Sequence, residues 1–370
     1  MKTTSTRLSI AGEKKHLLPD VDNYGFPSRI FYDILEESGF EMTSSLDGEY
    51  LLCINHKFSH YKDFLRKGGK RDKTILLRTE PKSVYPAQYK KRIEALYGLI
   101  ISPGGTDESC HTTEFVRQDY QFQNTHSGPT FFDPDLRELL QESLNRGKFT
   151  RQNWNNRSKN IVMLASNKFS PCLDSGYSIR RRIALMNLDL DVLQIYGKYW
   201  TSSLFIRFHQ FAAMYKFNLS TGILPHFNLA QFKRIECKGV IGEASSKFEL
   251  LDDSKFLLVV ENSKDYITEK IFDAFVLGVI PIYIGPKIGE LGIPEKAFIQ
   301  IDWDLSNFSS VFASLNELDI ESYLGAIGTF ISSEDFWSKW HEDSVFKDIV
   351  YRINLFINTL NGSASEEIPN

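Results

Sequence analysis

The chain has 370 residues, of which 42% are hydrophobic and 13% aromatic, and its formal net charge is −4. This composition is typical of a folded protein and excludes a disordered one, and the length is sufficient for two α/β domains with complete cores. A slightly negative chain has no general basic field, so we expect no nucleic-acid partner.

The cysteines and the N-terminus favour a cytoplasmic protein. Cys53, Cys110, Cys172 and Cys237 are far apart and form no CxxC pair, as is typical of reduced thiols. The N-terminal sequence MKTTSTRLSIAGEKKHLLPD lacks the apolar core of a signal peptide. No segment approaches the roughly 20 apolar residues of a membrane span.

Residues 26–125 alternate between helical patterns and short apolar runs, which predicts a first α/β domain. The helical patterns are Ile30–Leu35 and Tyr89–Leu96, and the apolar runs are YLLCINH, TILLRTE and GLIIS. Residues 136–144 predict a short helix. The polar stretch 146–160 that follows has the composition of a linker.

A second α/β series begins at residue 161. The runs 161–166 and 192–197 predict strands, with a helix between them at Ile179–Met186. At the C-terminus, apolar residues from Phe346 to Leu360 recur at helical spacing and predict an amphipathic helix.

The stretch KFLLVVENSKDYITEKIFDAFVLGVIPIYIGP, residues 255–286, predicts a strand–helix–strand unit. Phe256–Val260 and Val279–Ile284 are continuous apolar runs, as in buried parallel strands. Between them apolar residues recur at helical spacing up to Gly278, which occupies a C-cap position. The polar insert Glu261–Lys270 therefore lies beyond the carboxyl end of a strand, where open α/β sheets bind ligands.

Two cationic clusters in this second series favour a phosphate ligand. Lys270 follows Glu269 in the first turn of the predicted helix, where a cation is unfavourable unless it meets an anion. Arg180, Arg181 and Arg182 lie near another helix start, and guanidinium groups suit phosphate oxygens. Either cluster alone is typical of a solvated face. Together, at the ends of two strands of one sheet, they predict a diphosphate clamp.

Other nucleotide and metal sites have less support. The sequence contains neither GxGxxG after a strand nor GxxxxGK[ST]. The DxD patterns Asp189–Asp191 and Asp302–Asp304 could hold a divalent ion, but such short patterns arise easily by chance. His56 and His60 have ligand-like spacing without an evident third ligand. We therefore expect no metal site and no required cofactor.

Glu80 is a candidate general base in the first series. The apolar run Ile75–Leu77 predicts a strand, and Glu80 follows it directly before Pro81. A carboxylate that projects from a strand end can take a proton from a substrate hydroxyl. A surface glutamate in a turn is the alternative interpretation.

The sequence resembles the α-1,3-fucosyltransferases of glycosyltransferase family 10, in their bacterial type. The motif ENS followed by YITEK and VIPIYIG carries the resemblance, together with the run-in CKGVIGEASSKFELLDDSKF and the upstream segment ASNKFSPCLDSGYSIRRRIALMNLDLDVLQIYGK. It covers about residues 160–303, and the first series only through RTEP. The resemblance implies two Rossmann-like α/β domains that face a central cleft, the glycosyltransferase B-type architecture.

The implied domains are an acceptor-binding domain at 1–155 and a nucleotide-sugar domain at 156–334. A C-terminal helix at 335–362 would pack back on the first domain, and a loose tail would occupy 363–370. Lack of a membrane anchor differs from the Golgi members and favours a cytoplasmic enzyme.

The resemblance also implies roles for single residues. Arg180 and Lys270 would contact the donor's diphosphate, with Arg181 or Arg182 replacing Arg180 if the register differs. The nucleotide-sugar pocket would be lined by Asn262, Tyr266 and Glu269. Glu80 matches the catalytic base.

The implied reaction is an inverting transfer of fucose from GDP-fucose to a hydroxyl of an oligosaccharide or lipid-linked glycan, without a metal. Two departures bear on the donor sugar: Val260 replaces the usual Phe, and the insert between Ser263 and Tyr266 is short. The alternatives are a transferase of the same architecture with another nucleotide sugar, and a non-catalytic nucleotide-binding relative. The basic cluster at 62–73 is a candidate contact with anionic lipid at the inner face of the membrane. The acceptor, the linkage and the oligomeric state are not encoded in a recognisable motif.

Overall fold

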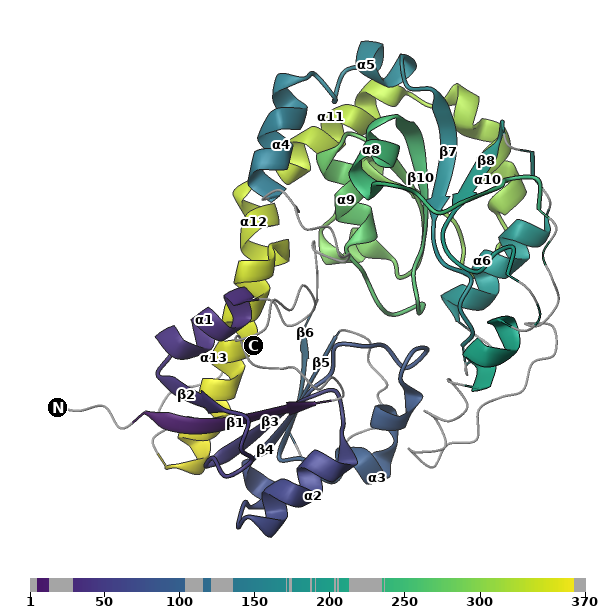
Figure 1. Cartoon of the computed structure of the whole chain (residues 1–370). Helices are drawn as coiled ribbons and strands as arrows, with labels where there is room; N and C mark the ends of the chain where they lie inside the picture. Colours follow the sequence, from purple (N-terminus) through teal and green to yellow (C-terminus); the bar gives the residue numbers. More distant parts are fainter. Residues whose placement is uncertain are drawn as a thin grey trace. The chain divides into compact units, whose positions relative to one another are not determined.

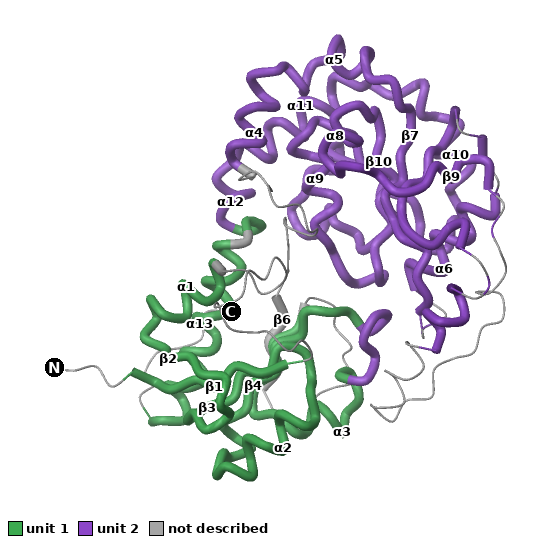
Figure 2. The backbone as a smooth tube through the Cα atoms, in the orientation of Figure 1, with its two compact units in different colours: residues 1–81, 88–129, 339–370 green, residues 82–87, 130–338 purple. Residues whose placement is uncertain are grey.

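The computed structural model describes residues 5–12, 29–103, 116–120, 136–170, 175–186, 191–202, 206–212 and 238–362, with single positions at 172, 188, 189, 204, 235 and 237. Within these residues the chain divides into two compact units (Figure 2). Unit 1 comprises residues 1–81, 88–129 and 339–370, and unit 2 comprises 82–87 and 130–338. Each unit contains a six-stranded sheet in its described part.

Unit 1 is built on a parallel sheet with the strand order β2-β1-β3-β4-β5-β6. Its strands are β1 (Thr6–Gly12), β2 (Phe40–Thr43), β3 (Tyr50–Ile54), β4 (Thr74–Leu77), β5 (Leu99–Pro103) and β6 (Val116–Tyr120). Its helices include α1 (Arg29–Glu37), α2 (Phe58–Arg66), α3 (Lys91–Glu94) and α13 (Glu342–Leu360) (Figure 1).

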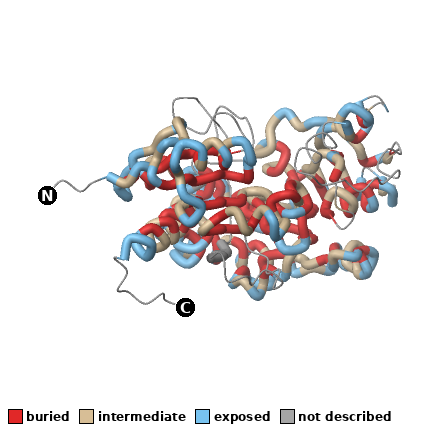
Figure 3. The backbone as a smooth tube through the Cα atoms, turned by 90° about the horizontal axis from the view of Figure 1, so that it is seen from below, coloured by how far each residue is buried: buried red, intermediate tan, exposed pale blue. Residues whose placement is uncertain are grey.

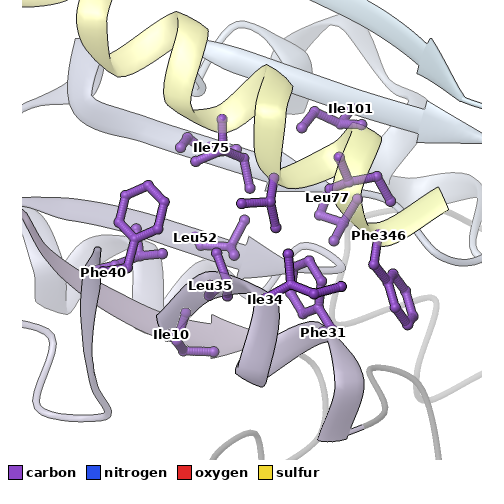
Figure 4. Packing of buried hydrophobic residues seen from close by; sticks show 14 of the residues in the cluster. Ile10, Phe31, Ile34, Leu35, Phe40, Leu52, Ile75, Leu77, Ile101 and Phe346 are labelled. Atoms are coloured by element: carbon purple, nitrogen blue, oxygen red, sulfur yellow. The ribbon is translucent and has the colours of Figure 1, made fainter. Parts of the chain in front are cut away.

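Both faces of the unit 1 sheet are covered, because alternate residues of its strands point to opposite sides. Leu52 and Leu77 face the core formed with α1 and α13, where Phe31 and Phe346 also pack (Figure 4). On the other side Leu51 and Leu76 pack against α2, with further residues Cys53, Tyr61, Phe64, Tyr97 and Ile100. Strands that are buried on both faces explain the continuous apolar runs in the sequence.

Unit 2 has a second parallel sheet with the strand order β12-β11-β10-β7-β8-β9. Its strands are β7 (Lys159–Leu164), β8 (Leu193–Tyr196), β9 (Val240–Gly242), β10 (Ser254–Val260), β11 (Ile280–Ile284) and β12 (Ile299–Gln300). Its helices include α4 (Leu136–Asn145), α5 (Arg151–Asn155), α6 (Gly176–Leu185), α8 (Lys247–Asp252), α9 (Lys270–Val276), α10 (Phe308–Ser314), α11 (Ile320–Ile331) and α12 (Glu334–Trp340).

The strand order of unit 2 reverses between β7 and β10. The chain runs from β7 outward to β9, returns to pair β10 with β7, and then continues through β11 to β12. Such a reversal leaves a crevice at the carboxyl ends of the two central strands. Strands β3, β4 and β11 are buried throughout, and helix α9 is buried from Ile271 to Val276. Figure 3 shows the backbone coloured by burial.

The predicted two-domain α/β fold and the strand–helix–strand unit at 255–286 are confirmed by β10, α9 and β11. Gly278 ends α9 with a φ of +61°, the left-handed conformation expected of a C-cap glycine.

The predicted linker at 146–160 is wrong. This stretch contains α5 and the start of β7, and Thr150 caps α5 by accepting a hydrogen bond from the Asn153 amide. The Arg157 side chain is buried and donates to the carbonyl oxygens of Lys148, Ser254, Leu277 and Gly278. The polar composition of this stretch predicts a linker because the hydrogen bonds from Arg157 to its carbonyl partners form only in the folded chain.

The boundaries of the compact units also differ from the predicted domain limits at 155/156 and 334/335. Residues 130–155 and the short segment 82–87 are grouped with unit 2. The predicted single helix at 335–362 is divided into α12 and α13 by His341, whose side chain accepts from the Asp343 amide and starts the second helix. The predicted tail at 363–370 lies outside the described residues.

No helix in the described ranges is long and apolar enough to cross a lipid bilayer.

Candidate functional site

The carboxylate of Glu261 organises the loop that follows β10. Its side chain is buried and accepts three hydrogen bonds: from the Thr268 amide at 2.9 Å, the Thr268 hydroxyl at 2.7 Å and the Tyr283 hydroxyl at 3.2 Å. Burial raises the pKa of Glu261, and the nearby Lys270 and the Thr268 hydrogen bonds act in the opposite direction. Glu261 therefore ties the end of β10 to the start of α9.

Lys270 is the first residue of α9 and lies within this loop structure. Its ammonium group donates to the Thr268 hydroxyl at 2.9 Å and lies 3.4 Å from a carboxylate oxygen of Glu269. The two side chains keep 24% and 13% of their surface exposed, so both are accessible to a ligand. The Thr268 hydroxyl, which donates to Glu261 and accepts from Lys270, links the buried acid to the partly exposed cation.

Helix α6 lies against the same loop at its first residue. The amide of Gly176 donates to the Asn262 carbonyl at 3.0 Å, and a Cβ at Gly176 would lie 1.6 Å from the Glu261 carbonyl oxygen. Only glycine allows this approach. The sequence therefore permits the N-terminal end of α6 to lie against the end of β10.

Arg180 connects α6 to the loop. Its Nη2 group donates to the Val260 carbonyl and, at 3.0 Å, to the Asn262 side-chain oxygen. Burial lowers the pKa of Arg180, whereas Tyr177, Glu261 and Glu269 raise it. The buried Arg180 Nε has no hydrogen-bond partner within the described part of the chain.

The structure thus brings Arg180, Asn262, Glu269 and Lys270 together at the reversal point between β7 and β10. The fifth predicted residue, Tyr266, belongs to the same loop, is almost fully buried, and its amide donates to the Ser263 carbonyl at 3.3 Å. The short insert before Tyr266 therefore forms a tight turn.

Sequence reasoning missed the structural role of Glu261 and a group around Asn167. Arg181 and Arg207 are both buried, and both donate to Asn167, to its side-chain oxygen and its carbonyl oxygen respectively. Asn167 lies just beyond β7, at the same edge of the sheet. Glu261 directly follows an apolar run, and this position was the signal that could have predicted its buried role. Nothing in the sequence indicated the role of Asn167.

The other candidate ligands occupy local structures. The carboxylates of Asp302 and Asp304 accept hydrogen bonds from the Ser306 hydroxyl and amide respectively. His56 is buried, its Nδ1 lies 2.8 Å from the Tyr97 hydroxyl, and burial lowers its pKa to about 4. Within the ranges that the structure describes, no group of three or more His, Cys, Asp or Glu side chains could hold a metal ion.

Glu80 lies in unit 1, beyond the carboxyl end of β4. The residue is half-buried, and its carbonyl oxygen accepts from Gln88 Nε2 at 3.1 Å and the Tyr89 hydroxyl at 2.9 Å. The position after a strand end is the one predicted for it.

Residues 225–324 match the family model of the C-terminal domain of glycosyltransferase family 10, the fucosyltransferases. This segment is therefore similar to that domain over about a hundred residues. It includes Asn262, Tyr266, Glu269 and Lys270, whereas Glu80 and Arg180 lie outside the matched residues.

Curated relatives align with the chain over a short stretch. The chain is 42% identical over 69 residues to the 4-galactosyl-N-acetylglucosaminide 3-alpha-L-fucosyltransferase 9 of Mus musculus, covering 18% of this chain and 19% of that protein. It is 39% identical over 70 residues to the GDP-fucose protein O-fucosyltransferase 3 of Gallus gallus, covering 18% of this chain and 12% of that protein. The similarity therefore spans less than a fifth of the length of each relative.

The structural likeness extends over nearly the whole chain. A crystal structure of an alpha1,3-fucosyltransferase superposes with a TM-score of 0.51 at 16% identity, covering 97% of this chain and 91% of that chain. A second, with GDP, has a TM-score of 0.50 at 15% identity and covers 97% and 92%. These likenesses establish the two-domain fold.

Proposed function

We propose that the protein is an inverting fucosyltransferase that moves fucose from GDP-fucose to a hydroxyl of a glycan. The observation that carries the proposal is the family match at 225–324, which includes the loop where Asn262, Glu269 and Lys270 lie together. The mouse and chicken relatives that align with part of the chain are named as fucosyltransferases. The arrangement of cations at a sheet reversal point supports a phosphate-bearing ligand.

In the proposed reaction Glu80 removes the proton from an acceptor hydroxyl as its oxygen attacks the anomeric carbon of the donor. The bond between that carbon and the diphosphate oxygen breaks, and GDP leaves with the electron pair. The anomeric configuration inverts through a transition state that resembles an oxocarbenium ion.

Negative charge accumulates on the departing GDP and must be stabilised. Lys270 keeps its ammonium group partly exposed, and Arg180 has a buried N–H group at Nε that a phosphate oxygen can accept from. We propose that these two cations bind the diphosphate. Asn262, Tyr266 and Glu269 would line the pocket for the nucleoside and the sugar, and no divalent ion would be needed.

The acceptor is proposed to be an oligosaccharide or a lipid-linked glycan. Residues 62–73 could contact anionic lipid in the second case, although Arg66 pairs with Asp63 at 3.0 Å and Lys73 pairs with Glu49 at 2.7 Å. Co-sedimentation with anionic vesicles at low and high salt would test this contact. No binding at low salt would contradict it.

Calorimetric titration with GDP, UDP, GDP-fucose and GDP-mannose, with EDTA present throughout, tests the donor. We expect binding of GDP and GDP-fucose alone. Binding of UDP species only, or of no nucleotide until a divalent ion is added, would contradict the proposal and favour a different nucleotide-sugar transferase.

The variant Glu80→Gln tests the catalysis. We expect it to abolish fucose transfer and leave GDP affinity unchanged, because the amide cannot accept the acceptor's proton. Transfer at a normal rate would show that the base lies elsewhere. A wild-type chain that binds GDP-fucose but transfers nothing to a panel of glycan acceptors would favour a non-catalytic relative.

A further inference from the structure

The backbone at Glu80 is held from two sides. The Glu80 carbonyl oxygen accepts hydrogen bonds from Gln88 Nε2 and the Tyr89 hydroxyl, at 3.1 Å and 2.9 Å. Pro81 follows, and a proline disfavours the helical conformation for the residue before it. The peptide plane between Glu80 and Pro81 is therefore fixed, and with it the direction in which the Glu80 side chain leaves the backbone.

Gln88 is itself held by several groups. The residue is fully buried, its side-chain oxygen accepts from the His56 amide at 3.3 Å, and its Nε2 also donates to Asn55 Oδ1 at 3.2 Å. Asn55 Oδ1 accepts from the Thr79 amide at 3.0 Å as well. The strand ends of β3 and β4 are thus joined through one glutamine side chain.

Arg78 contacts both Gln88 and Tyr89. Its guanidinium is fully buried, donates to the Gln88 carbonyl and lies 4.2 Å from the centroid of the Tyr89 ring. It also donates to Glu94 at 2.6 Å and to the Ser102 hydroxyl at 3.0 Å. A buried network of this kind resists movement, because a group that moves would leave its hydrogen-bond partner unpaired.

We propose that Tyr89 and Gln88, supported by the buried Arg78–Glu94 pair, are positioning residues that orient Glu80 for proton removal. This inference rests on the proposed function, in which Glu80 is the base. A general base must reach the proton within hydrogen-bond distance, and small misplacements lower the rate of the chemical step more than they lower substrate binding. The network acts through the Glu80 backbone and does not itself take the proton.

The test compares Tyr89→Phe with the matched variant Tyr50→Phe. Tyr89→Phe removes one of the two hydrogen bonds to the Glu80 carbonyl and keeps the ring over Arg78. Tyr50→Phe removes a hydroxyl in the same unit that donates to Asn361 at 3.1 Å, at the start of β3 and away from Glu80. Steady-state fucose transfer, calorimetric GDP binding and thermal unfolding are measured for both.

We expect Tyr89→Phe to lower kcat by about 3- to 10-fold, the effect of one neutral hydrogen bond, with KM for the donor and affinity for GDP unchanged. Tyr50→Phe should leave kcat within about 2-fold of the wild type, because one peripheral hydrogen bond contributes little. An unchanged kcat in Tyr89→Phe would overturn the inference. So would equal losses of kcat in the two variants, or a loss in Tyr89→Phe matched by weaker GDP binding.

The outcomes separate this inference from the proposed function. If the wild-type chain transfers fucose and Tyr89→Phe transfers it equally fast, only the positioning role fails. If the wild-type chain transfers no fucose, the proposed function fails, and the inference fails with it.

Discussion

Glu261 shows how one buried carboxylate can organise a partly exposed cation. Three hydrogen bonds satisfy the carboxylate, and two of them come from Thr268, whose hydroxyl in turn accepts from Lys270. A buried acid that lacked these partners would be strongly destabilising. The apolar run of β10 ends at Glu261 because this residue anchors the loop, and in the proposed function Lys270 is the group that meets the donor's diphosphate.

Lys270→Ala should lower turnover about 10²- to 10³-fold, the usual effect of losing one charged donor to a leaving group. The structure supports this expectation because the Lys270 side chain is partly exposed beside Glu269. Single-turnover kinetics with saturating GDP-fucose would measure the chemical step. The variant Lys264→Ala, on an exposed residue of the same loop, is the control, and near-normal turnover of Lys270→Ala would exclude its role.

Glu261→Gln should weaken GDP binding about tenfold, which corresponds to the loss of roughly one charge-assisted hydrogen bond. One side-chain oxygen accepts from the Thr268 amide and from Tyr283, so the new amide nitrogen must face the Thr268 hydroxyl. That hydroxyl would then accept from the amide and direct its hydrogen toward Lys270, which is itself a donor.

Calorimetry of Glu261→Gln beside Tyr283→Phe checks this prediction. The second variant removes one hydrogen bond to the same carboxylate and leaves Thr268 untouched, so we expect GDP affinity within about 3-fold of the wild type. GDP affinity in Glu261→Gln equal to that of the wild type would show that the link from Glu261 to Lys270 has no effect on the ligand.

At the scale of elements, α9 contains a buried acid from which we predict a dependence of the stability of unit 2 on pH. Asp273 is almost fully buried, and its carboxylate accepts from Lys247 at 3.0 Å. Burial raises the pKa of Asp273 from 3.8 to about 6, although Lys247 acts in the opposite direction. The folded state therefore binds more protons than the unfolded state between these two values.

The free energy of unfolding should consequently fall as pH rises from about 4 to about 6, by an Asp273 contribution on the order of 2 to 3 kcal/mol. Asp273→Asn should remove this contribution, because the amide does not titrate. Urea unfolding of unit 2 at several pH values would measure it, with Asp335→Asn, on an exposed residue of α12 in the same unit, as the control. Identical pH dependence in wild type and Asp273→Asn would contradict the raised pKa.

The two elements on either side of the candidate site meet through glycine. Gly176 starts α6, and a Cβ there would lie 1.6 Å from the Glu261 carbonyl oxygen. The helix therefore lies against β10 only because this residue has no side chain. The short spacing from Gly176 to Arg180 then brings the guanidinium to the Val260 carbonyl.

At the scale of the whole molecule, the C-terminal helix completes the core of the N-terminal unit. Ile349 and Ile353 of α13 are fully buried in one cluster with Leu52 of β3 and Leu77 of β4. Residues that are almost 300 positions apart therefore share one core, and the stability of unit 1 depends on the end of the chain.

Ile353→Ala should lower the free energy of unfolding of unit 1 by about 2 to 5 kcal/mol, since it opens a cavity in a closely packed core. Hydrogen exchange resolved by peptide should show lost protection in β1, β3 and β4 and unchanged protection in β10 and β11. Tyr351→Ala, on an exposed residue of α13, should have little effect. Equal loss of protection in both units would contradict the separate cores.

The sequence by itself determined the elements whose signals are local. The strand–helix–strand unit at 255–286 follows from apolar runs and helical spacing, and Gly278 ends its helix as its position predicts. The motif residues Asn262, Tyr266, Glu269 and Lys270 are contiguous enough to be recognised by family resemblance. Glu80 could be placed after a strand because the strand's apolar run and the following proline are adjacent in the chain.

Only the tertiary structure decided which polar groups are buried and what they contact. By composition Arg157 belongs to a predicted linker. In the folded chain it is buried and donates hydrogen bonds to carbonyl oxygens of β10 and of the residues that end α9. Glu261 and Arg78 are anchored by residues from other segments, and their burial depends on those partners. The cost of burying a charge is offset by contacts distant in sequence, and composition and periodicity do not encode those contacts.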